Sequence, residues 1–175
     1  MLKTKSSPNS INLRAIYCCV RHTEFTMHST LSLSQYVKKR NGVPLGASHS
    51  MRNMLSRSFG AKSFPIFWQY WNPIWSYYLS RNVMRPLVSF FPIYLSILIT
   101  FLVSGALHDL AVSVIKWKTI VFFTPWFGLM GLMVIASQKA GISYGHLAWF
   151  VRASINASFI FVSLGITYFV ESIYA

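Results

Sequence analysis

The polarity of the chain changes about halfway along its length. Residues 1–42 are rich in Lys, Arg and Ser and lack a sustained apolar period, which predicts a loosely ordered basic tail. Residues 88–115 are almost wholly apolar, and as a helix they are long enough to cross a bilayer core of about 30 Å. Two further apolar stretches, 119–137 and 147–174, predict a second and a third span, and Pro125 is expected to kink or delay the second. The pattern predicts an all-α fold, an integral membrane helical bundle with about three transmembrane helices.

Two kinds of helix are expected in residues 43–87, between the tail and the transmembrane region 88–175. The first is a short basic amphipathic helix that Ser48 or Ser50 can cap and Gly60 can end. Its apolar face consists of Met51, Met54, Leu55 and Phe59. Such a helix suits either a membrane surface or a position docked on the protein itself.

The second kind is aromatic and begins at Phe64, with the sequence FPIFWQYWNPIWSYY. Trp and Tyr favour the membrane–water interface, because an apolar ring there carries a polar edge. Pro73 suits the first turn of a helix, which makes Asn72 a natural N-cap. We therefore expect two short interfacial or re-entrant helices with a break at Asn72.

Charge and composition support this division. The 175 residues are 54% hydrophobic and only 11% charged, whereas a soluble domain usually has about a quarter of its residues charged. The formal net charge of +13 suits an anionic membrane face or an anionic substrate, and the high hydropathy argues against a nucleic-acid partner. All of the sixteen basic residues precede Pro86 except Lys116, Lys118, Lys139 and Arg152, which predicts a cytoplasmic N-terminus.

A polar stripe runs along the first predicted span. It recurs every fourth residue, at Ser96, Thr100, Ser104 and His108. In a helix this spacing places the side chains on one side, which should face other helices or a cavity rather than lipid. Gly105 lies beside the stripe and permits the close approach of a neighbouring helix.

Two other sets of polar residues are expected to contact neighbouring elements. Asp109 projects about 100° away from His108 on the helix, so it should serve a different neighbour, either a helix end or Arg152. The third span carries its own polar residues, which we expect to face the stripe on the first span: Arg152, Asn156, Ser163 and Thr167.

No metal site is predicted. Cys19, His22 and His28 lie near one another in sequence, but no second cluster completes a tetrahedral set and the spacing fits no familiar zinc pattern. The adjacent Cys18 and Cys19 cannot build a disulfide framework. We interpret these side chains as solvated loop residues.

At the segments FWQYWNP and SGALHD the sequence resembles the membrane-bound O-acyltransferase family. That family pairs an asparagine in a Trp-rich segment with a histidine in a hydrophobic helix some tens of residues later, and Asn72 and His108 occupy those positions. The surrounding RSFGAKSFPIFWQYWNPIWSYYLSRNVMRPL looks like the lead-in found in bacterial members, and the resemblance covers residues 44–139. Full members have many more spans, folded around a tunnel. The resemblance implies a short bacterial-type member or a C-terminal half, located in the bacterial inner membrane.

The resemblance also implies a reaction. An acyl group would move from acyl-CoA or another acyl thioester to a hydroxyl acceptor, with no bound cofactor. His108 would be the general base, since the pKa of histidine lies near neutrality, and apolar neighbours at Leu107, Leu110 and Val112 should keep its ring neutral. Asn72 would either orient the acceptor or donate a hydrogen bond to the thioester carbonyl as negative charge develops.

Further residues are implied to bind substrate. Trp68, Trp71 and Trp75 would line an acyl pocket, and Ser104 would face it. The phosphates of a coenzyme A donor would meet a basic set, Arg81 and Arg85 together with Arg52, Arg57 and Lys62.

Each assignment has a structural alternative. The tryptophans suit interface anchors and the arginines suit topology determinants, while His108 could bridge two helices and Asn72 could be a plain cap. For the whole chain, the alternative is a non-catalytic membrane subunit or truncated half-enzyme that acts through a partner. That partner would be a larger membrane protein or a second copy of the chain. In either case the protein is also expected to contact membrane lipid.

Overall fold

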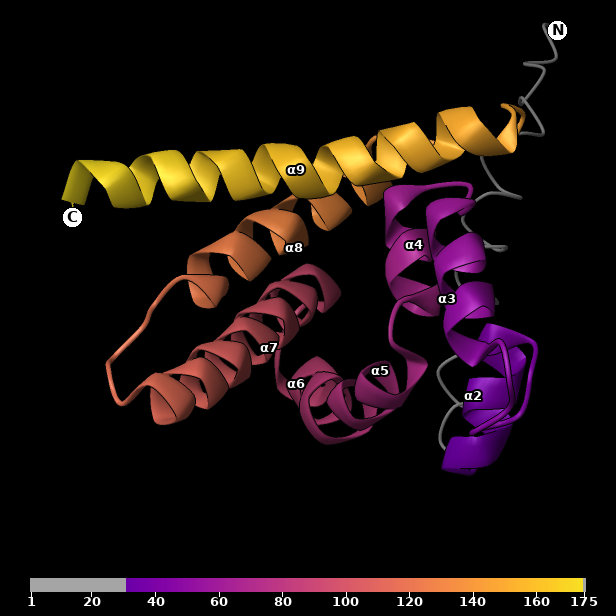
Figure 1. Cartoon of the computed structure of the whole chain (residues 1–175), viewed down its shortest axis with the longest axis horizontal. Coiled ribbons are helices and arrows are strands. Elements are labelled where there is room, and N and C mark those ends of the chain that lie inside the picture. The colour runs from indigo at the N-terminus through magenta and orange to yellow at the C-terminus, as the bar shows by residue number, and fades with distance from the viewer. Residues whose placement is uncertain (1–30, 175) are drawn as a thin grey trace, which may run out of the picture.

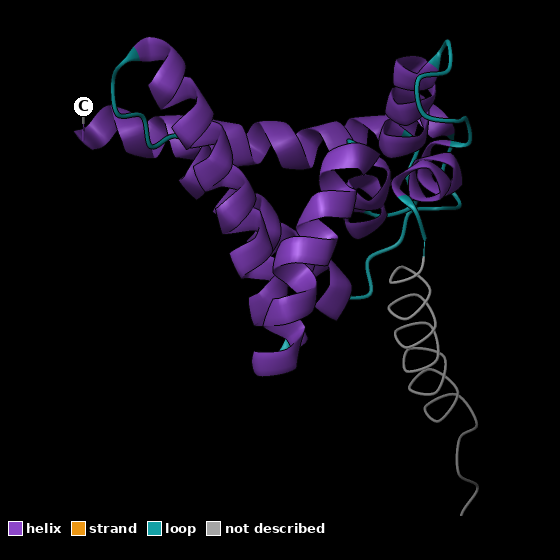
Figure 2. Cartoon of the chain, turned by 90° about the horizontal axis from the view of Figure 1, so that it is seen from below, coloured by secondary structure: helices purple, strands orange, loops and turns teal. Residues whose placement is uncertain are grey.

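The computed structural model describes residues 31–174, and in that range the chain is helical and contains no strand (Figures 1 and 2). The all-α prediction is confirmed for this part of the chain. The helices are α2 (Leu33–Asn41), α3 (Ser50–Phe59), α4 (Phe64–Tyr70), α5 (Pro73–Leu79), a π-helical turn (Ser80–Met84), α6 (Arg85–Phe90), α7 (Ile93–Lys116), α8 (Phe123–Lys139) and α9 (Trp149–Tyr174). Most of the predicted basic tail, with Cys18, Cys19, His22 and His28, lies outside the described residues.

The last part of the predicted tail differs from expectation, because residues 33–41 form the helix α2 rather than loosely ordered chain. Ser32 and Gln35 form a capping box at its start, and Gly42 ends it in the left-handed conformation. Tyr36 and Val37 are buried and attach the helix to its neighbours. With so few apolar positions, α2 offered no sustained periodic signal in the sequence.

A short helix was expected within residues 43–60, but α3 begins only at Ser50 and is not capped by either serine. His49 precedes its first residue in the left-handed conformation, with φ 66° and no side-chain cap. Gly60 ends the helix as predicted. The break in the aromatic segment is also confirmed, since α4 and α5 flank Asn72 and Pro73 opens α5.

Two helices, α7 and α9, are long and apolar enough to cross a membrane. Only 17% of the apolar window of each is buried within the protein, whereas the core helix of a soluble domain is mostly buried. Helix α8 has 17 residues, at the lower limit for a span. Its start at Phe123 shows that Pro125 delays it, as predicted. A bundle with three spans is therefore not confirmed.

The first span also begins later than predicted. Helix α5, the π-helical turn and α6 follow one another without a break, and Pro86 lies just after the turn. A proline inside a helix removes one amide donor and crowds the preceding turn, and wider π-helical winding accommodates both effects. Phe91 then takes extended backbone before Pro92, so α7 starts only at Ile93.

The α7–α8 hairpin is the most extensive helix pairing in the described part of the chain (Figure 1). A Cβ added at Gly105 would lie 2.6 Å from the Phe123 carbonyl oxygen, so this glycine allows the start of α8 to reach the backbone of α7. The neighbouring hydrophobic core joins α4, α7 and α8, and its buried members are Ala61, Phe64, Phe67, Ile97, Met130 and Val134. Figure 1 shows α9 crossing the hairpin and reaching α3 and α4 with its N-terminal half.

Candidate functional site

The His108 ring is oriented by the turn of α7 that precedes it. Its Nδ1 lies 2.7 Å from the carbonyl oxygen of Ser104. A carbonyl oxygen only accepts, so Nδ1 carries the proton in this hydrogen bond. In the neutral ring, Nε2 then holds the lone pair. The local backbone of α7 therefore selects the tautomer in which Nε2 can accept a proton.

Three aromatic rings surround His108. The ring centroid of Trp75 lies 5.8 Å away in an edge-on arrangement. Those of Phe123 and Phe127, from the first turns of α8, lie 5.7 and 5.1 Å away. Leu107 and Leu110, which were expected to surround the ring, are 41% and 59% exposed, so the apolar neighbours that the protein itself supplies to His108 are these three rings.

Ser104 connects His108 to the aromatic segment. The residue is 4% exposed, and its hydroxyl accepts a 2.9 Å hydrogen bond from Nε1 of Trp75. The same residue thus positions two rings, Trp75 through its hydroxyl and His108 through its carbonyl oxygen. The predicted contact between Ser104 and substrate stays a prediction.

Asn72 is exposed and caps α5. It has φ 40°, and its Oδ1 accepts a 3.2 Å hydrogen bond from the backbone amide of Trp75. Capping uses only the oxygen of the side chain, and the Nδ2 amide has no partner among the described residues. Capping and chemistry are therefore compatible at this position, and Trp75 contacts both Asn72 and His108.

The other two predicted pocket tryptophans differ in their distance from this cluster. Trp68 is one ring removed from His108, since its centroid lies 6.1 Å from that of Phe127. Trp71 stacks on Phe67 at 5.3 Å and meets Phe59 edge-on, so it packs against α3 and α4 instead. Trp68 and Trp75 remain candidates for an acyl pocket near His108, whereas Trp71 makes contacts of the hydrophobic core.

The two predicted phosphate-binding arginines lie on the helix that continues α5. Arg81 is exposed, and its Nη1 donates a 2.7 Å hydrogen bond to the hydroxyl of Tyr77, one turn earlier. Arg85 is partly buried at the first residue of α6. Their role toward a donor substrate stays a prediction.

Asp109 caps the start of α8, which is one of the two roles predicted for it. Its Oδ1 accepts from the amides of Phe122 and Phe123 at 2.9 and 2.7 Å, and its Oδ2 from the amide and hydroxyl of Thr124 at 2.8 and 2.6 Å. This cap fixes the turn of α8 that presents Phe123 to His108. Adjacent residues of α7 thus contribute to one site, His108 directly and Asp109 through α8.

Sequence reasoning missed Phe123 and Phe127 as neighbours of His108. One signal was present: Pro125 marks the first turn of a helix, and the free amides of such a turn need an acceptor. Asp109 is the acidic residue nearest to Pro125 in the sequence. Pairing the two would have placed the start of α8 beside this part of α7.

The polar residues of α9 do not face the stripe on α7, contrary to expectation. Asn156 donates from Nδ2 to the carbonyl oxygens of Phe59 and Ala61 and accepts from the hydroxyl of Tyr144. Ser163 accepts from Nε1 of Trp126 at 3.0 Å. These residues bind α9 to the α3–α4 turn and to α8, because α8 lies between α9 and much of α7.

Within the described residues, no group of three His, Cys, Asp or Glu side chains is placed to hold a metal ion. Comparisons with protein-family models, with curated proteins and with solved structures gave no match.

Proposed function

We propose that this protein is an integral membrane acyltransferase that moves an acyl group from an acyl thioester to a hydroxyl acceptor. The proposal rests on the resemblance of the Asn72 and His108 segments to the membrane-bound O-acyltransferases. The observation that carries it is the hydrogen bond from His108 Nδ1 to the Ser104 carbonyl oxygen. It supports a general base because it leaves Nε2 as the proton-accepting atom of a ring held by three aromatic side chains.

The proposed reaction is a direct transfer. His108 Nε2 takes the proton of the acceptor hydroxyl while the oxygen attacks the thioester carbonyl. A tetrahedral oxyanion forms, the carbon–sulfur bond breaks, and the thiolate takes the proton back from His108. The Ser104 carbonyl oxygen holds the ring through both transfers and favours the transient imidazolium.

Asn72 has two possible roles in this scheme, and both use its Nδ2 amide. It either donates to the developing oxyanion or orients the acceptor oxygen. Trp75 and Trp68 are proposed to contact the acyl chain, and Arg81 and Arg85 to contact the phosphates of an acyl-CoA donor. No residue of the site requires a bound cofactor in this scheme.

The proposed location is a bacterial inner membrane with the N-terminus in the cytoplasm. The inner-membrane location and the orientation both go beyond the finding that α7 and α9 are long and apolar enough to span a membrane. The orientation follows from the basic residues that precede Pro86. Membrane lipid is then the medium of the reaction and a possible source of the acceptor.

A second candidate is a subunit that completes its site with a partner. One observation favours it: beside His108, α7 presents Leu107, Leu110 and Val114 with 41%, 59% and 62% of their surfaces exposed. This apolar face suits lipid, but it equally suits a helix of a larger membrane protein or of a second copy. The chain would then supply one wall of an acyl tunnel rather than all of it.

Transfer of a labelled acyl group by the purified, detergent-solubilised chain tests the proposal. General acid–base catalysis typically contributes about 10²–10⁴-fold to a rate, so His108→Ala should lose activity on that scale. His146→Ala is the matched control, because His146 is exposed in the loop before α9. Helix content and elution volume are compared for all three proteins.

Equal turnover by the wild type and the His108→Ala variant would rule out His108 as the base. Absence of transfer by folded wild-type protein would favour the partner-dependent subunit. The molecular mass of the complex extracted in mild detergent would then identify a second copy or a larger partner.

A further inference from the structure

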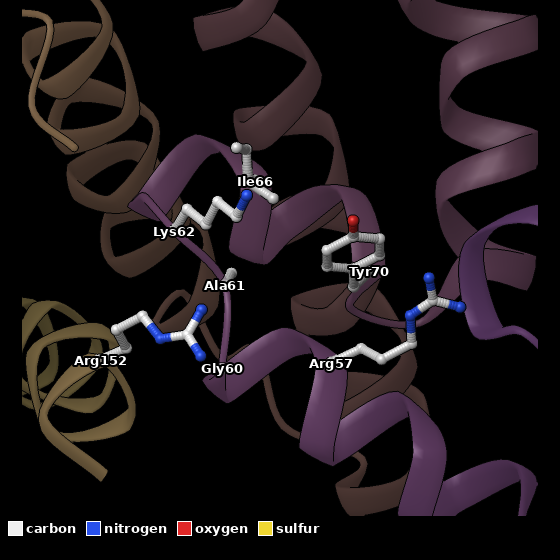
Figure 3. Close-up of a pocket in the computed structure, with 7 residues that line it drawn as sticks. All are labelled: Arg57, Gly60, Ala61, Lys62, Ile66, Tyr70 and Arg152. Carbon is white, nitrogen blue, oxygen red and sulfur yellow. The ribbon is translucent and has the colours of Figure 1, made fainter. Parts of the chain in front are cut away.

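A pocket at the junction of α3, α4 and α9 is separate from the residues around His108. It has a volume of about 380 Å³ and is lined by three basic side chains, Arg57, Lys62 and Arg152, with Tyr70 at one end (Figure 3). Each basic residue comes from a different segment: α3, the α3–α4 turn and α9. Three cations from three segments lie around one cavity, which indicates an anionic ligand.

No carboxylate lines this pocket within the described part of the chain. The protein has only three acidic residues, Glu24, Asp109 and Glu171. Asp109 caps α8, Glu171 lies about 28 Å along α9 from Arg152 by the helical rise, and Glu24 lies outside the described residues. The described structure therefore leaves the positive charges of the pocket without an acidic neighbour.

Arg57 and Arg152 are partly buried, and Lys62 is exposed. Arg152 has a buried Nε without a hydrogen-bond partner among the described residues, and its guanidinium points toward Gly60 and Ala61 (Figure 3). The aliphatic stem of Lys62 packs beside Gly145. At the other end, the Arg57 guanidinium lies 5.1 Å from the ring centroid of Tyr70. The buried Nε shows that the Arg152 guanidinium lies partly inside the protein, and its terminal nitrogens are the groups that can donate to an anion in the pocket.

The pocket lies at one end of a candidate span. Arg152 is in the first turn of α9, and the neighbouring Trp149 donates from Nε1 to the carbonyl oxygen of Ser56. Tryptophan and arginine at the end of a span mark the level of lipid headgroups, where phosphate groups are abundant. We infer that this pocket binds a phosphate group, with Arg152 and Lys62 as its main contacts. Arg57 and Lys62 also belong to the set expected to meet the phosphates of a coenzyme A donor, but the pocket is separate from His108, and phosphate binding there can be tested without acyl transfer.

Two sources could supply the phosphate, the headgroup of an anionic phospholipid or a soluble phosphate. The full-length protein in detergent is titrated with short-chain phosphatidylglycerol, with the matching diacylglycerol and with inorganic phosphate, and the midpoint of thermal unfolding is measured. A rise with phosphatidylglycerol alone identifies the headgroup, and a rise with inorganic phosphate identifies a soluble source. No rise with either phosphate compound, or an equal rise with diacylglycerol, would overturn the inference.

Variants locate the effect. Charge-assisted hydrogen bonds contribute about 1.5–3 kcal/mol, which corresponds to about 10–100-fold in affinity. Arg152→Gln should weaken the apparent affinity for the phosphate compound on that scale, and Lys118→Gln, which removes an exposed charge elsewhere, should not. Lys62→Gln keeps the test valid if Arg152→Gln does not fold, because Lys62 is exposed. Unchanged affinity in the folded variants would place the phosphate elsewhere.

Discussion

The α7–α8 hairpin and helix α9 are attached to the protein in different ways. In the hairpin, backbone approaches backbone at Gly105, and side chains of α7 pack directly on Gly128 and Gly131 of α8. Helix α9 is attached by polar side chains at intervals, such as Asn156 and Ser163. Phe161, which lies between these two, is 68% exposed.

This difference determines how firmly each region holds its residues in place. Close packing at Gly105, Gly128 and Gly131 fixes the hairpin at several points, so His108 and the rings from α8 keep their mutual distances. Separate hydrogen bonds fix α9 at a few points and leave much of its apolar surface exposed. Substitutions that change side-chain volume should therefore destabilise the hairpin most, and substitutions that remove a polar group should loosen α9 most.

Gly105→Ala should have the largest effect on the hairpin. The new methyl group would meet the backbone of Phe123 and Thr124 at 2.6–2.9 Å, and backbone atoms cannot move aside separately. We expect a loss of about 3 kcal/mol in the free energy of unfolding, the upper end of ordinary overpacking. Gly165→Ala on α9 is the control, since nothing lies within 4 Å of that position. Unfolding in mixed micelles measures both, and equal stability of the two variants would contradict the close approach.

Asp109→Ala should cost somewhat less, about 2 kcal/mol, because it removes the acceptor for the first amides of α8. It should also lower acyl transfer, since the turn that presents Phe123 to His108 would lose its cap. Glu171→Gln, which changes an exposed acidic residue of α9, is the control. Hydrogen exchange at the start of α8 measures the loss of order, and unchanged protection there would contradict the capping role.

Asn156→Ala should loosen α9 while leaving the hairpin intact. The carbonyl oxygens of Phe59 and Ala61 and the hydroxyl of Tyr144 would lose their partner, which costs about 1–2 kcal/mol. Faster hydrogen exchange in the N-terminal half of α9, with unchanged exchange in α7, is the expected result. Ser158→Ala, on the exposed side of α9, serves as the control. Loosening of α7 to the same extent would show that the two regions are not independent.

Tyr144→Phe should have the smallest effect on stability at neutral pH. Its effect should be seen when stability is measured at alkaline pH. Burial raises the pKa of Tyr144 to about 12 from an ordinary value of 10.0. Between pH 10 and about 12, Tyr144 loses its proton in the unfolded chain and keeps it in the folded protein. The contribution of Tyr144 to stability is therefore constant below pH 10 and falls as the pH rises toward 12. Tyr144→Phe should remove this part of the fall. An identical alkaline profile in the variant would show that Tyr144 does not titrate in this way.

Local signals in the sequence predicted several features correctly. Pro73 required a helix start, which located the break at Asn72. Gly60 ended α3, and Gly105 marked a close approach of two helices. Asp109 was expected at a helix end, and it is found there. Each of these depends on the chemistry of one residue and its immediate neighbours.

Features that depend on how helices cross were not predictable in the same way. The rings of Phe123 and Phe127 reach His108 only because α8 folds back along α7. The polar side of α9 meets the α3–α4 turn and α8, and periodicity alone identifies a polar face without naming its neighbour. Helix α2 was missed because it buries few apolar side chains, including Tyr36 and Val37.

The unequal lengths of α7 and α8 have a consequence for the membrane location proposed above. Their 24 and 17 residues rise about 36 Å and about 26 Å, and a typical hydrocarbon core is about 30 Å thick. In the proposed membrane location, α7 would be longer and α8 shorter than this thickness, so the pair would tilt and the lipid would thin beside α8. Because α7 carries His108 and α8 carries two of the rings around it, we expect the site to respond to the chain length of the host lipid.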